Sequence, residues 1–197
     1  TAVCNLASIS LKSCLDYPDT SNYKVLIYKK NDCIFCLMAE NLCKSKNITY
    51  EVKPYGEYSL VDNESIRPSD VITFPKIFIN QTYIGGYEDF EKYLCPKYNY
   101  TKLKDITKIL TNNLNNIIDY NYYPTKKTER SNLLHRPIGI GVQGLANVFY
   151  ELKIPFDSEE ASDINSKIFE TIYYGSLEAS MEIAKERENY VKLLKEL

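Results

Sequence analysis

The chain has 197 residues, 44% of them hydrophobic, which is enough to bury the cores of one large or two small domains. Lys and Arg number 24 against 26 Asp and Glu, a net charge of −2, and no basic cluster longer than a pair is flanked by stacking aromatic residues. We therefore expect no nucleic-acid partner. No apolar run reaches the roughly 18 residues of a membrane span, so we expect no membrane partner either.

The start of the chain, Thr1-Ala2-Val3-Cys4-Asn5, has neither an initiator Met nor the basic and apolar regions of a signal peptide. We therefore expect an excerpt of a longer polypeptide. Six cysteines in a chain of this length are too few for a disulfide scaffold. This cysteine content indicates a reducing compartment, and we expect a cytoplasmic protein.

Strand and helix patterns alternate between residues 22 and 95. Residues 24–28 form a short β-branched, apolar run typical of a buried strand, and residues 37–43 repeat apolar and small side chains at helical spacing. The other expected elements are a strand at 48–52, a polar loop with a poorly marked helix at 54–70, strands at 71–79 and 82–84 joined by a turn at Asn80-Gln81, and a helix at 87–94. This order predicts a compact α/β unit of the size of one small domain.

Two helices are expected after this unit. The first ends near Tyr120, and its apolar face comprises Leu103, Ile106, Leu110, Leu114, Ile117 and Ile118. A pattern resembling a capping box, Asp157 with Glu160, opens the second. Its expected apolar face comprises Ala161, Ile164, Ile168, Ile172 and Tyr173.

The pair Cys33-Ile34-Phe35-Cys36 carries the clearest chemistry. A cysteine is nucleophilic as the thiolate, which a helix N-terminus or nearby cations stabilise. Cys33 lies at the predicted strand-to-helix junction, and Lys29 and Lys30 precede it. Because Cys36 follows one helical turn later, it can attack a mixed disulfide formed on Cys33 and release the reduced partner.

The pair Cys33–Cys36 has two other possible interpretations. The pair could be half of a zinc site, but a closed zinc site needs four ligands, and Cys43, Cys95 and His135 are isolated from one another in the sequence. It could also be a pair of unreactive buried thiols. We expect no metal in this chain.

Three segments resemble, in order, the motifs of the glutaredoxin family. They are Tyr28-Lys29-Lys30-Asn31-Asp32-Cys33-Ile34-Phe35-Cys36, Thr73-Phe74-Pro75 and Gly85-Gly86-Tyr87-Glu88-Asp89-Phe90. The resemblance implies a thioredoxin-like α/β domain over residues 20–96 that uses glutathione as co-substrate. Two positions depart from the family pattern: Ile34 and Phe35 replace the usual Pro and Tyr, and Glu88 replaces a small polar residue or Asp.

The glutaredoxin resemblance also implies a glutathione site. Pro75 is expected to be a cis-proline facing the cysteines, with Thr73 and Phe74 beside it so that the Phe74 backbone pairs with the cysteinyl part of glutathione. Lys30 is expected to meet a glutathione carboxylate. The helix that follows Gly86, through Tyr87 and Glu88, is expected to receive the γ-glutamyl end.

A second motif, Gly139-Ile140-Gly141-Val142-Gln143-Gly144, matches the GxGxxG of dinucleotide-binding folds. That fingerprint needs a buried strand before it and an acidic residue ending a second strand roughly 20 residues later. Here a polar, proline-bearing stretch precedes the motif and a predicted helix follows Asp157. We therefore expect no dinucleotide site.

The flanking segments are similar to the large subunit of aerobic ribonucleotide reductases. The similar stretches are residues 2–9, 117–124, 135–146 (HRPIGIGVQGLA) and 168–175. The resemblance implies that residues 1–16 and 99–197 are mainly helical pieces of an α/β-barrel subunit. Cys4 matches one member of the family's active-site cysteine pair, and an ordinary buried strand cysteine is the alternative. His135 and Arg136 are expected to be structural.

The whole sequence thus predicts a glutathione-dependent exchange domain inside a ribonucleoside-diphosphate reductase large chain, to which it supplies reducing equivalents. The implied partners are glutathione, the disulfides of the parent reductase including its tail thiols, and the small radical-bearing subunit. The alternative is a non-catalytic, thioredoxin-like docking module for a reductase partner. No other stretch resembles the family's radical-bearing cysteine loop, so we expect no ribonucleotide conversion by this chain alone.

Overall fold

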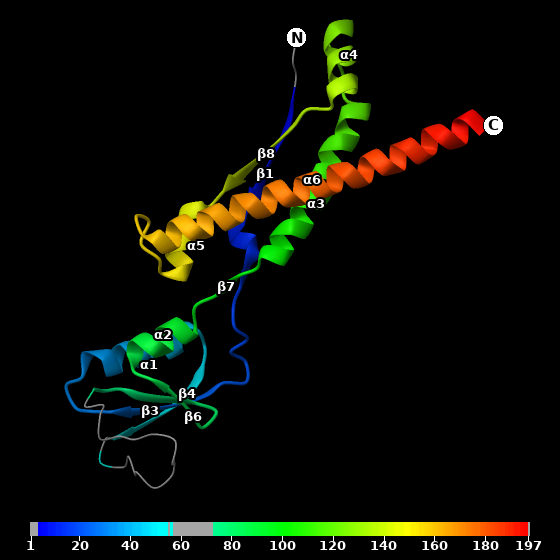
Figure 1. The fold of residues 1–197 in the computed structure, drawn as a ribbon. Coiled ribbons are helices and arrows are strands. Elements are labelled where there is room, and N and C mark those ends of the chain that lie inside the picture. Colours follow the sequence, from blue (N-terminus) through cyan, green and yellow to red (C-terminus); the bar gives the residue numbers. More distant parts are fainter. Residues whose placement is uncertain (1–3, 55, 57–72, 197) are drawn as a thin grey trace. The chain divides into compact units, whose positions relative to one another are not determined.

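A computed structural model describes residues 4–54, 56 and 73–196, and the side chains up to residue 188. The expected loop and helix at 54–70, the first two residues of the expected strand at 71–79, and Ala2-Val3 of the reductase-like stretch lie largely outside the described residues. The chain divides into two compact units (Figure 1). One comprises Tyr17–Pro96, and the other comprises Thr1–Asp16 with Lys97–Leu197.

The unit Tyr17–Pro96 is built on a four-stranded sheet in the order β4-β3-β5-β6. Its strands are β3 (Lys24–Lys29), β4 (Thr49–Pro54), β5 (Lys76–Ile79) and β6 (Thr82–Gly85). Strand β3 pairs parallel with β4 and antiparallel with β5, and β5 pairs antiparallel with β6. The helices are α1 (Ile34–Ser45), which connects β3 to β4, and α2 (Tyr87–Tyr93). These elements confirm the predicted α/β order outside the undescribed part of residues 54–70.

Strand alternation explains the core of this unit. Val25 and Ile27 on β3 and Ile77 and Ile79 on β5 project to the same face of the sheet and are buried. Figure 1 shows α1 and α2 together on one side of the sheet. Helix residues of the same core cluster are Ala39, Cys43 and Phe90.

The hairpin between β5 and β6 turns where the sequence predicts it. Asn80 and Gln81 both have positive φ, 48° and 71°. Positive φ at both central residues is the requirement of a tight turn whose twist matches that of the flanking strands, and Asn tolerates this conformation well. This turn fixes the register of β6 against β5.

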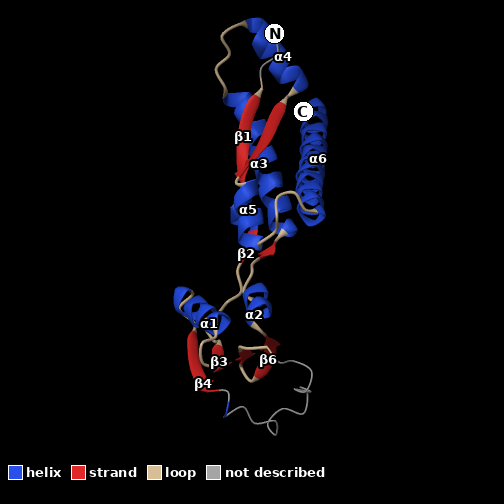
Figure 2. Ribbon diagram, turned by 90° about the vertical axis from the view of Figure 1, so that its left-hand side faces the viewer, coloured by secondary structure: helices blue, strands red, loops and turns tan. Residues whose placement is uncertain are grey.

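The second unit combines a two-stranded parallel sheet with several helices (Figure 2). Strand β1 (Asn5–Ser10) pairs with β8 (Ile138–Gln143), and the short strands β2 (Leu15–Asp16) and β7 (Lys97–Tyr98) pair antiparallel. The helical elements are the 3-10 helix η1 (Leu11–Cys14), α3 (Tyr100–Tyr120), α4 (Lys126–His135), α5 (Leu145–Leu152) and α6 (Glu159–Glu196). Helix α3 packs against α6 and against both strands of the β1–β8 pair.

The two predicted helices of this unit are present, but one residue of each predicted apolar face is exposed. Leu103, Leu114 and Ile118 are buried on α3, but Ile117 is 46% exposed, and on α6 the expected face residue Tyr173 is 68% exposed. Both positions are adjacent to a buried residue, and one step along a helix turns a side chain by about 100°, out of the contact with the partner helix.

The predicted capping box at the start of α6 is wrong by one residue. The helix begins at Glu159, and the Oγ atom of Ser158 accepts the N–H of Ala161 at 3.1 Å. Ser158, not Asp157, is therefore the residue whose side chain satisfies an N-terminal amide of this helix. Helix α4 was not predicted from the sequence; Thr125 caps it by accepting the N–H of Thr128.

The GxGxxG segment adopts a conformation unlike a phosphate-binding loop. Gly139 and Gly141 lie inside strand β8, whereas the dinucleotide fingerprint places its glycines in the turn after a strand. Gly144, with φ +81°, forms the tight connection to α5. Within the described residues, no helix has both the length and the apolar character needed to cross a bilayer.

Candidate functional site

Cys33 occupies the N-cap position of α1, as the sequence predicts. Its backbone is extended, with φ −101° and ψ 107°, and its Sγ atom accepts the N–H of Cys36 at 3.2 Å. Asp32, with φ 57°, turns the chain out of β3 just before it. The sulfur therefore lies where unpaired amides and the helix dipole favour negative charge.

Cys33 and Cys36 are joined by a disulfide, with their Cα atoms 5.2 Å apart. The two cysteines differ in exposure: Cys33 is partly exposed, whereas Cys36 is 1% exposed and lies against the core. An external thiol or disulfide can reach Cys33 more readily than Cys36. This asymmetry suits Cys33 as the attacking sulfur and Cys36 as the resolving one.

The segment before β5 lies next to the cysteines. The Phe74-Pro75 peptide bond is cis, as the glutaredoxin resemblance implies, and the carbonyl oxygen of Phe74 lies 3.6 Å from the Sγ atom of Cys33. The register of the sheet explains this contact. Tyr28 on β3 pairs with Lys76 on β5, so the residues that follow Tyr28 run beside those that precede Lys76.

The third glutaredoxin-like motif, residues 85–90, also contacts the cysteine segment, through a pair of aromatic rings. The ring of Phe35 lies 6.2 Å from that of Tyr87, centre to centre, with 35° between the planes. Gly86 is the N-cap of α2, and its N–H donates to the Asp89 carboxylate at 3.1 Å. Glu88, in the first turn of α2, is exposed.

The hydroxyl of Tyr87 is turned toward its own helix. It donates a hydrogen bond of 2.7 Å to Glu91, and burial together with this carboxylate raises the pKa of Tyr87 to about 12. Tyr87 therefore remains a neutral phenol at neutral pH. It offers the site an aromatic surface and not a titrating group.

The two lysines expected near Cys33 differ in their contacts. The Nζ atom of Lys29 lies 3.0 Å from a carboxylate oxygen of Glu40 on α1, so Lys29 forms an ion pair within the domain. Lys30 is exposed. The sequence analysis missed Glu40 because its pairing depends on how α1 packs against β3.

Lys76 is a further residue that the sequence analysis missed. It follows Pro75 directly, is 4% exposed, and its Nζ lies 5.7 Å from the centre of the Phe74 ring. Burial lowers its pKa below the ordinary lysine value. Its signal in the sequence is a cation within the otherwise apolar run at 74–79.

Of the other two cysteines of this unit, Cys43 is less accessible than Cys33. Cys43 is fully buried on α1, and burial, with a smaller contribution from Glu40, raises the pKa of its thiol to about 11. Cys95 is partly exposed. In the parts of the chain that the structure describes, no three His, Cys, Asp or Glu side chains are grouped so that they could hold a metal ion.

Cys4 belongs to the other unit. It directly precedes strand β1 and is exposed in this chain. Its Sγ atom lies 3.6 Å from the carbonyl oxygen of Asn5. Gly139 on the neighbouring strand β8 faces the same sulfur.

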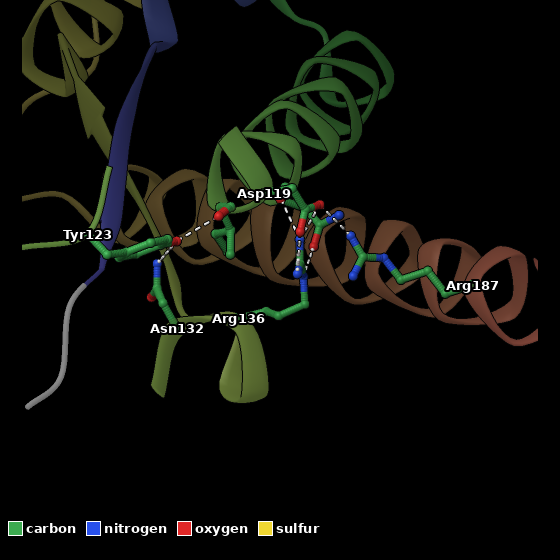
Figure 3. Close-up of polar contacts among 7 residues, drawn as sticks. Asp119, Tyr123, Asn132, Arg136 and Arg187 are labelled. Atoms are coloured by element: carbon green, nitrogen blue, oxygen red, sulfur yellow. Dashed lines mark hydrogen bonds and ion pairs between the residues drawn. The ribbon is translucent and has the colours of Figure 1, made fainter. Parts of the chain in front are cut away.

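Arg136 holds together two helices of this unit (Figure 3). It terminates α4 with φ 47°, a left-handed conformation that is uncommon for a residue with a side chain. Its guanidinium donates to both carboxylate oxygens of Asp119, at 2.9 and 2.8 Å, and to the side-chain and backbone oxygens of Asn115 on α3. Arg187 on α6 donates to the same carboxylate at 2.9 Å.

A second link joins the same helices. The hydroxyl of Tyr123 donates to the carbonyl oxygen of Ile118 at 2.6 Å and accepts from the side-chain amide of Asn132 at 2.7 Å (Figure 3). Both sets of contacts are hydrogen bonds and ion pairs within this unit. They are consistent with the structural role expected for Arg136, and His135 is exposed beside them.

Comparison with known proteins agrees with both parts of this description. A family model described as "Ribonucleotide reductase, barrel domain" matches residues 77–195, and a glutaredoxin model matches residues 25–84. Glutaredoxin 1 from Francisella tularensis, solved in complex with cacodylate, is 30% identical over 35% of this chain and 88% of that chain, with a TM-score of 0.28.

The similar curated proteins are reductase subunits. The large subunit of ribonucleoside-diphosphate reductase from Variola virus is 60% identical over 147 residues, which cover 75% of this chain and 17% of that protein. The Acanthamoeba polyphaga mimivirus large subunit is 62% identical over 95 residues, 48% of this chain and 11% of that protein. Large chain 2 from Saccharomyces cerevisiae is 41% identical over 147 residues, 75% of this chain and 16% of that protein.

The chain spans about a sixth of the length of the Variola virus relative. The barrel-domain model covers more than half of the chain, and the glutaredoxin model covers the segment that contains Cys33, Cys36 and Pro75. The chain therefore belongs to the ribonucleotide reductase barrel-domain family and carries a glutaredoxin domain in the same polypeptide.

Proposed function

We propose that residues 20–96 act as a glutathione-dependent thiol-disulfide oxidoreductase, and that this domain supplies reducing equivalents to a ribonucleoside-diphosphate reductase large chain of which residues 1–16 and 99–197 are part. One observation carries the proposal. The more exposed sulfur of the pair, that of Cys33, lies at the N-terminus of α1 and 3.6 Å from the Phe74 carbonyl, with the buried Cys36 behind it.

The first step is attack by the Cys33 thiolate on a mixed disulfide between glutathione and a substrate thiol. A new bond forms between Cys33 and the glutathione sulfur, the original disulfide bond breaks, and its electron pair leaves on the substrate sulfur, which takes up a proton. A second glutathione thiolate then attacks the mixed disulfide. This step frees Cys33 and yields oxidised glutathione.

A protein disulfide is reduced by the two-thiol route. Cys33 attacks it to form a mixed disulfide, and Cys36 then attacks Cys33, releasing the second protein thiol and leaving the Cys33–Cys36 disulfide. Two electrons have passed to the substrate. Two glutathione molecules return the domain to the dithiol form and become oxidised glutathione.

The proposed glutathione site uses residues on three segments. We place the cysteinyl backbone against Thr73, Phe74 and Pro75, one carboxylate near the exposed Lys30, and the γ-glutamyl end near Gly86, Tyr87 and Glu88. The support is the match of residues 25–84 to the glutaredoxin family and the contacts of Phe74 and Tyr87 with the cysteine segment.

In the parent chain, we propose that Cys4 is one member of the cysteine pair that is oxidised when a ribonucleotide is reduced. The tail thiols of the parent are the proposed carriers between the exchange domain and that pair, and a small radical-bearing subunit is the proposed partner. The support is the similarity to reductase large subunits over 75% of this chain. A cytoplasmic location fits chemistry that depends on reduced glutathione.

The test is reduction of a small glutathione mixed disulfide by this chain, with glutathione and a coupled assay for oxidised glutathione. Cys33→Ser should abolish the activity, whereas Cys36→Ser should retain much of it because the one-thiol route needs only Cys33. Equal inactivation by both substitutions would contradict the assigned roles. A wild-type chain without activity would instead favour the non-catalytic docking module.

A further inference from the structure

The alternation of Ile138-Gly139-Ile140-Gly141-Val142 along β8 leaves one face of this strand without side chains. Ile140 and Val142 pack against the hydrophobic core of their unit. Gly139 and Gly141 project to the opposite face, because successive residues of a strand alternate. The parallel register places Leu6 opposite Gly139 and Ser8 opposite Gly141, and Cys4 lies two residues before Leu6.

Backbone conformation does not require glycine at either position. Neither Gly139 nor Gly141 has a positive φ, whereas Gly85 and Gly144 do. A side chain at Gly141 would make ordinary contacts, since its Cβ would lie 3.7 Å from the Ala7 carbonyl oxygen and 4.0 Å from the Ser8 Oγ. Any requirement for glycine on this strand must therefore be steric.

The surroundings of Gly139 are more crowded than those of Gly141. A Cβ atom there would lie 2.5 Å from Cδ2 of Leu6 and 3.6 Å from the Sγ atom of Cys4. The overlap with Leu6 involves the far end of a flexible side chain that is 76% exposed, so a change of rotamer removes it. The added methyl group would then remain in van der Waals contact with the sulfur.

We propose that the absence of a side chain at Gly139 keeps the Cys4 sulfur accessible to an attacking thiolate. This inference rests on the proposed role of Cys4 in the exchanging pair. An incoming sulfur must first reach van der Waals distance, roughly 3.5–4.0 Å from the Cys4 sulfur. A Cβ at position 139 would occupy the space within van der Waals distance of the Cys4 sulfur on the side of β8. With glycine at this position, a thiolate can approach the sulfur from that side; with alanine it cannot.

The step that needs this approach is reduction of the disulfide between Cys4 and its partner cysteine. A thiolate of a dithiol attacks the Cys4 sulfur, a new disulfide bond forms, and the electron pair of the old bond leaves on the partner sulfur. The second thiol of the same dithiol then displaces Cys4 as a thiolate. The dithiol is oxidised by two electrons, and both cysteines of the pair are reduced.

The test compares Gly139→Ala with Gly141→Ala in the full-length parent reductase. Both changes add one methyl group to the same strand face, but only the first places it beside Cys4. Two quantities are measured: the rate at which iodoacetamide alkylates Cys4 in the reduced enzyme, read by peptide mass, and the dependence of turnover on dithiothreitol concentration. Melting temperatures are recorded for each variant.

Gly139→Ala should slow alkylation of Cys4 by about tenfold and raise the KM for dithiothreitol with little change in kcat, because access and not chemistry is impaired. Gly141→Ala should stay within about twofold of wild type in both measurements. Equal effects of the two substitutions, or no effect of Gly139→Ala, would overturn the proposal. So would a loss of kcat that parallels a lower melting temperature.

Two further variants separate the possible failures. In Leu6→Ala with Gly139→Ala, the overlap with Leu6 is absent, so alkylation should stay slow; recovery to the wild-type rate would show that a displaced Leu6, and not the methyl group, blocks the sulfur. Cys4→Ser should abolish turnover. Full turnover of Cys4→Ser would refute the proposed role of Cys4 itself, whatever Gly139 does.

Discussion

The Sγ atom of Cys33 lies 3.6 Å from the carbonyl oxygen of Phe74, a residue 41 positions away in the sequence. The contact exists because β3 and β5 are neighbours, with Tyr28 opposite Lys76. It brings the first two glutaredoxin motifs together, and the ring contact of Phe35 with Tyr87 brings the third. The chemistry proposed for this domain depends on that convergence.

After reduction of the disulfide, Cys33 and Cys43 should be alkylated at different pH values. Cys33, at the N-terminus of α1, should react with iodoacetamide at mildly acidic pH, because helix amides favour its thiolate. Cys43 should not react in the folded chain at neutral pH, since burial raises the pKa of its thiol to about 11. Peptide mass mapping over a pH series gives both rates. Comparable labelling of the two residues at pH 6 would rule out an activated Cys33.

Lys30→Gln should raise the KM for glutathione several-fold and leave the rate with a non-glutathione disulfide unchanged. The reason is loss of an exposed cation that we place beside a glutathione carboxylate, a contact worth roughly 1 kcal/mol at an exposed site. Lys44→Gln is the matched control, because it removes a charge from the last turn of α1, far along the helix from Cys33. Equal KM values for the two variants would remove Lys30 from the site.

Tyr87→Phe should leave the pH profile of exchange unchanged between pH 6 and 9. The pKa of Tyr87 is raised to about 12, so the phenol does not titrate in this interval. Phe35→Ala should instead lower the rate throughout, because it removes the ring that contacts Tyr87. Initial rates at fixed ionic strength would check both, and a shifted pH optimum in Tyr87→Phe would contradict a purely aromatic role.

The sequence predicted the parts of the fold that depend on local patterns. The strand at β3, the turn at Asn80-Gln81 and the position of Cys33 at a helix start follow from residue type and spacing alone. The ion pair between Lys29 and Glu40 did not, because it depends on packing between a strand and a helix.

One of the other misses is local, and the other again depends on long-range packing. The identity of the residue that caps α6 depends on which of two adjacent polar residues, Asp157 or Ser158, lies at the helix boundary, and sequence patterns do not fix boundaries to one residue. The buried Lys76 was also missed, since only the folded sheet shows how completely it is covered. Long-range contacts therefore account for most of the differences.

Acid should destabilise the reductase-like unit partly through Asp119. Hydrogen bonds from Arg136, helped by the charges of Arg136 and Arg187, hold the pKa of this carboxyl below its usual value. A folded pKa below the unfolded one contributes stability that is present above the unfolded value, about 3.9, and is lost as pH falls through the folded value. Because the Asp119 side chain is 41% exposed, we expect a shift in melting temperature of only a few degrees.

Melting curves between pH 7 and pH 3 test this expectation. Asp119→Asn should lower the melting temperature at pH 7 and flatten its decline toward pH 3. Asp105→Asn, which removes an exposed carboxylate from the same helix, is the matched control and should change neither. If the two variants show the same pH dependence, the contacts of Arg136 with Asp119 do not contribute to acid stability.

The reason for joining an exchange domain to a reductase is the effective concentration of its dithiol. Short flexible links give effective concentrations on the order of mM, above what a free donor commonly supplies. We expect the linked domain to recharge the tail thiols of the parent, because we propose that Cys4 lies on a barrel strand of the parent, where a whole folded domain would not reach it. We therefore claim that the electrons are donated within one polypeptide.

Turnover of the full-length parent reductase, with glutathione as sole donor and then with dithiothreitol, tests that claim most directly. The measurement compares wild type with Cys33→Ser under both donors. We predict that Cys33→Ser loses most of the glutathione-driven rate and keeps the dithiothreitol-driven rate, since dithiothreitol bypasses the exchange domain. Unchanged glutathione-driven turnover in Cys33→Ser would contradict donation by this domain.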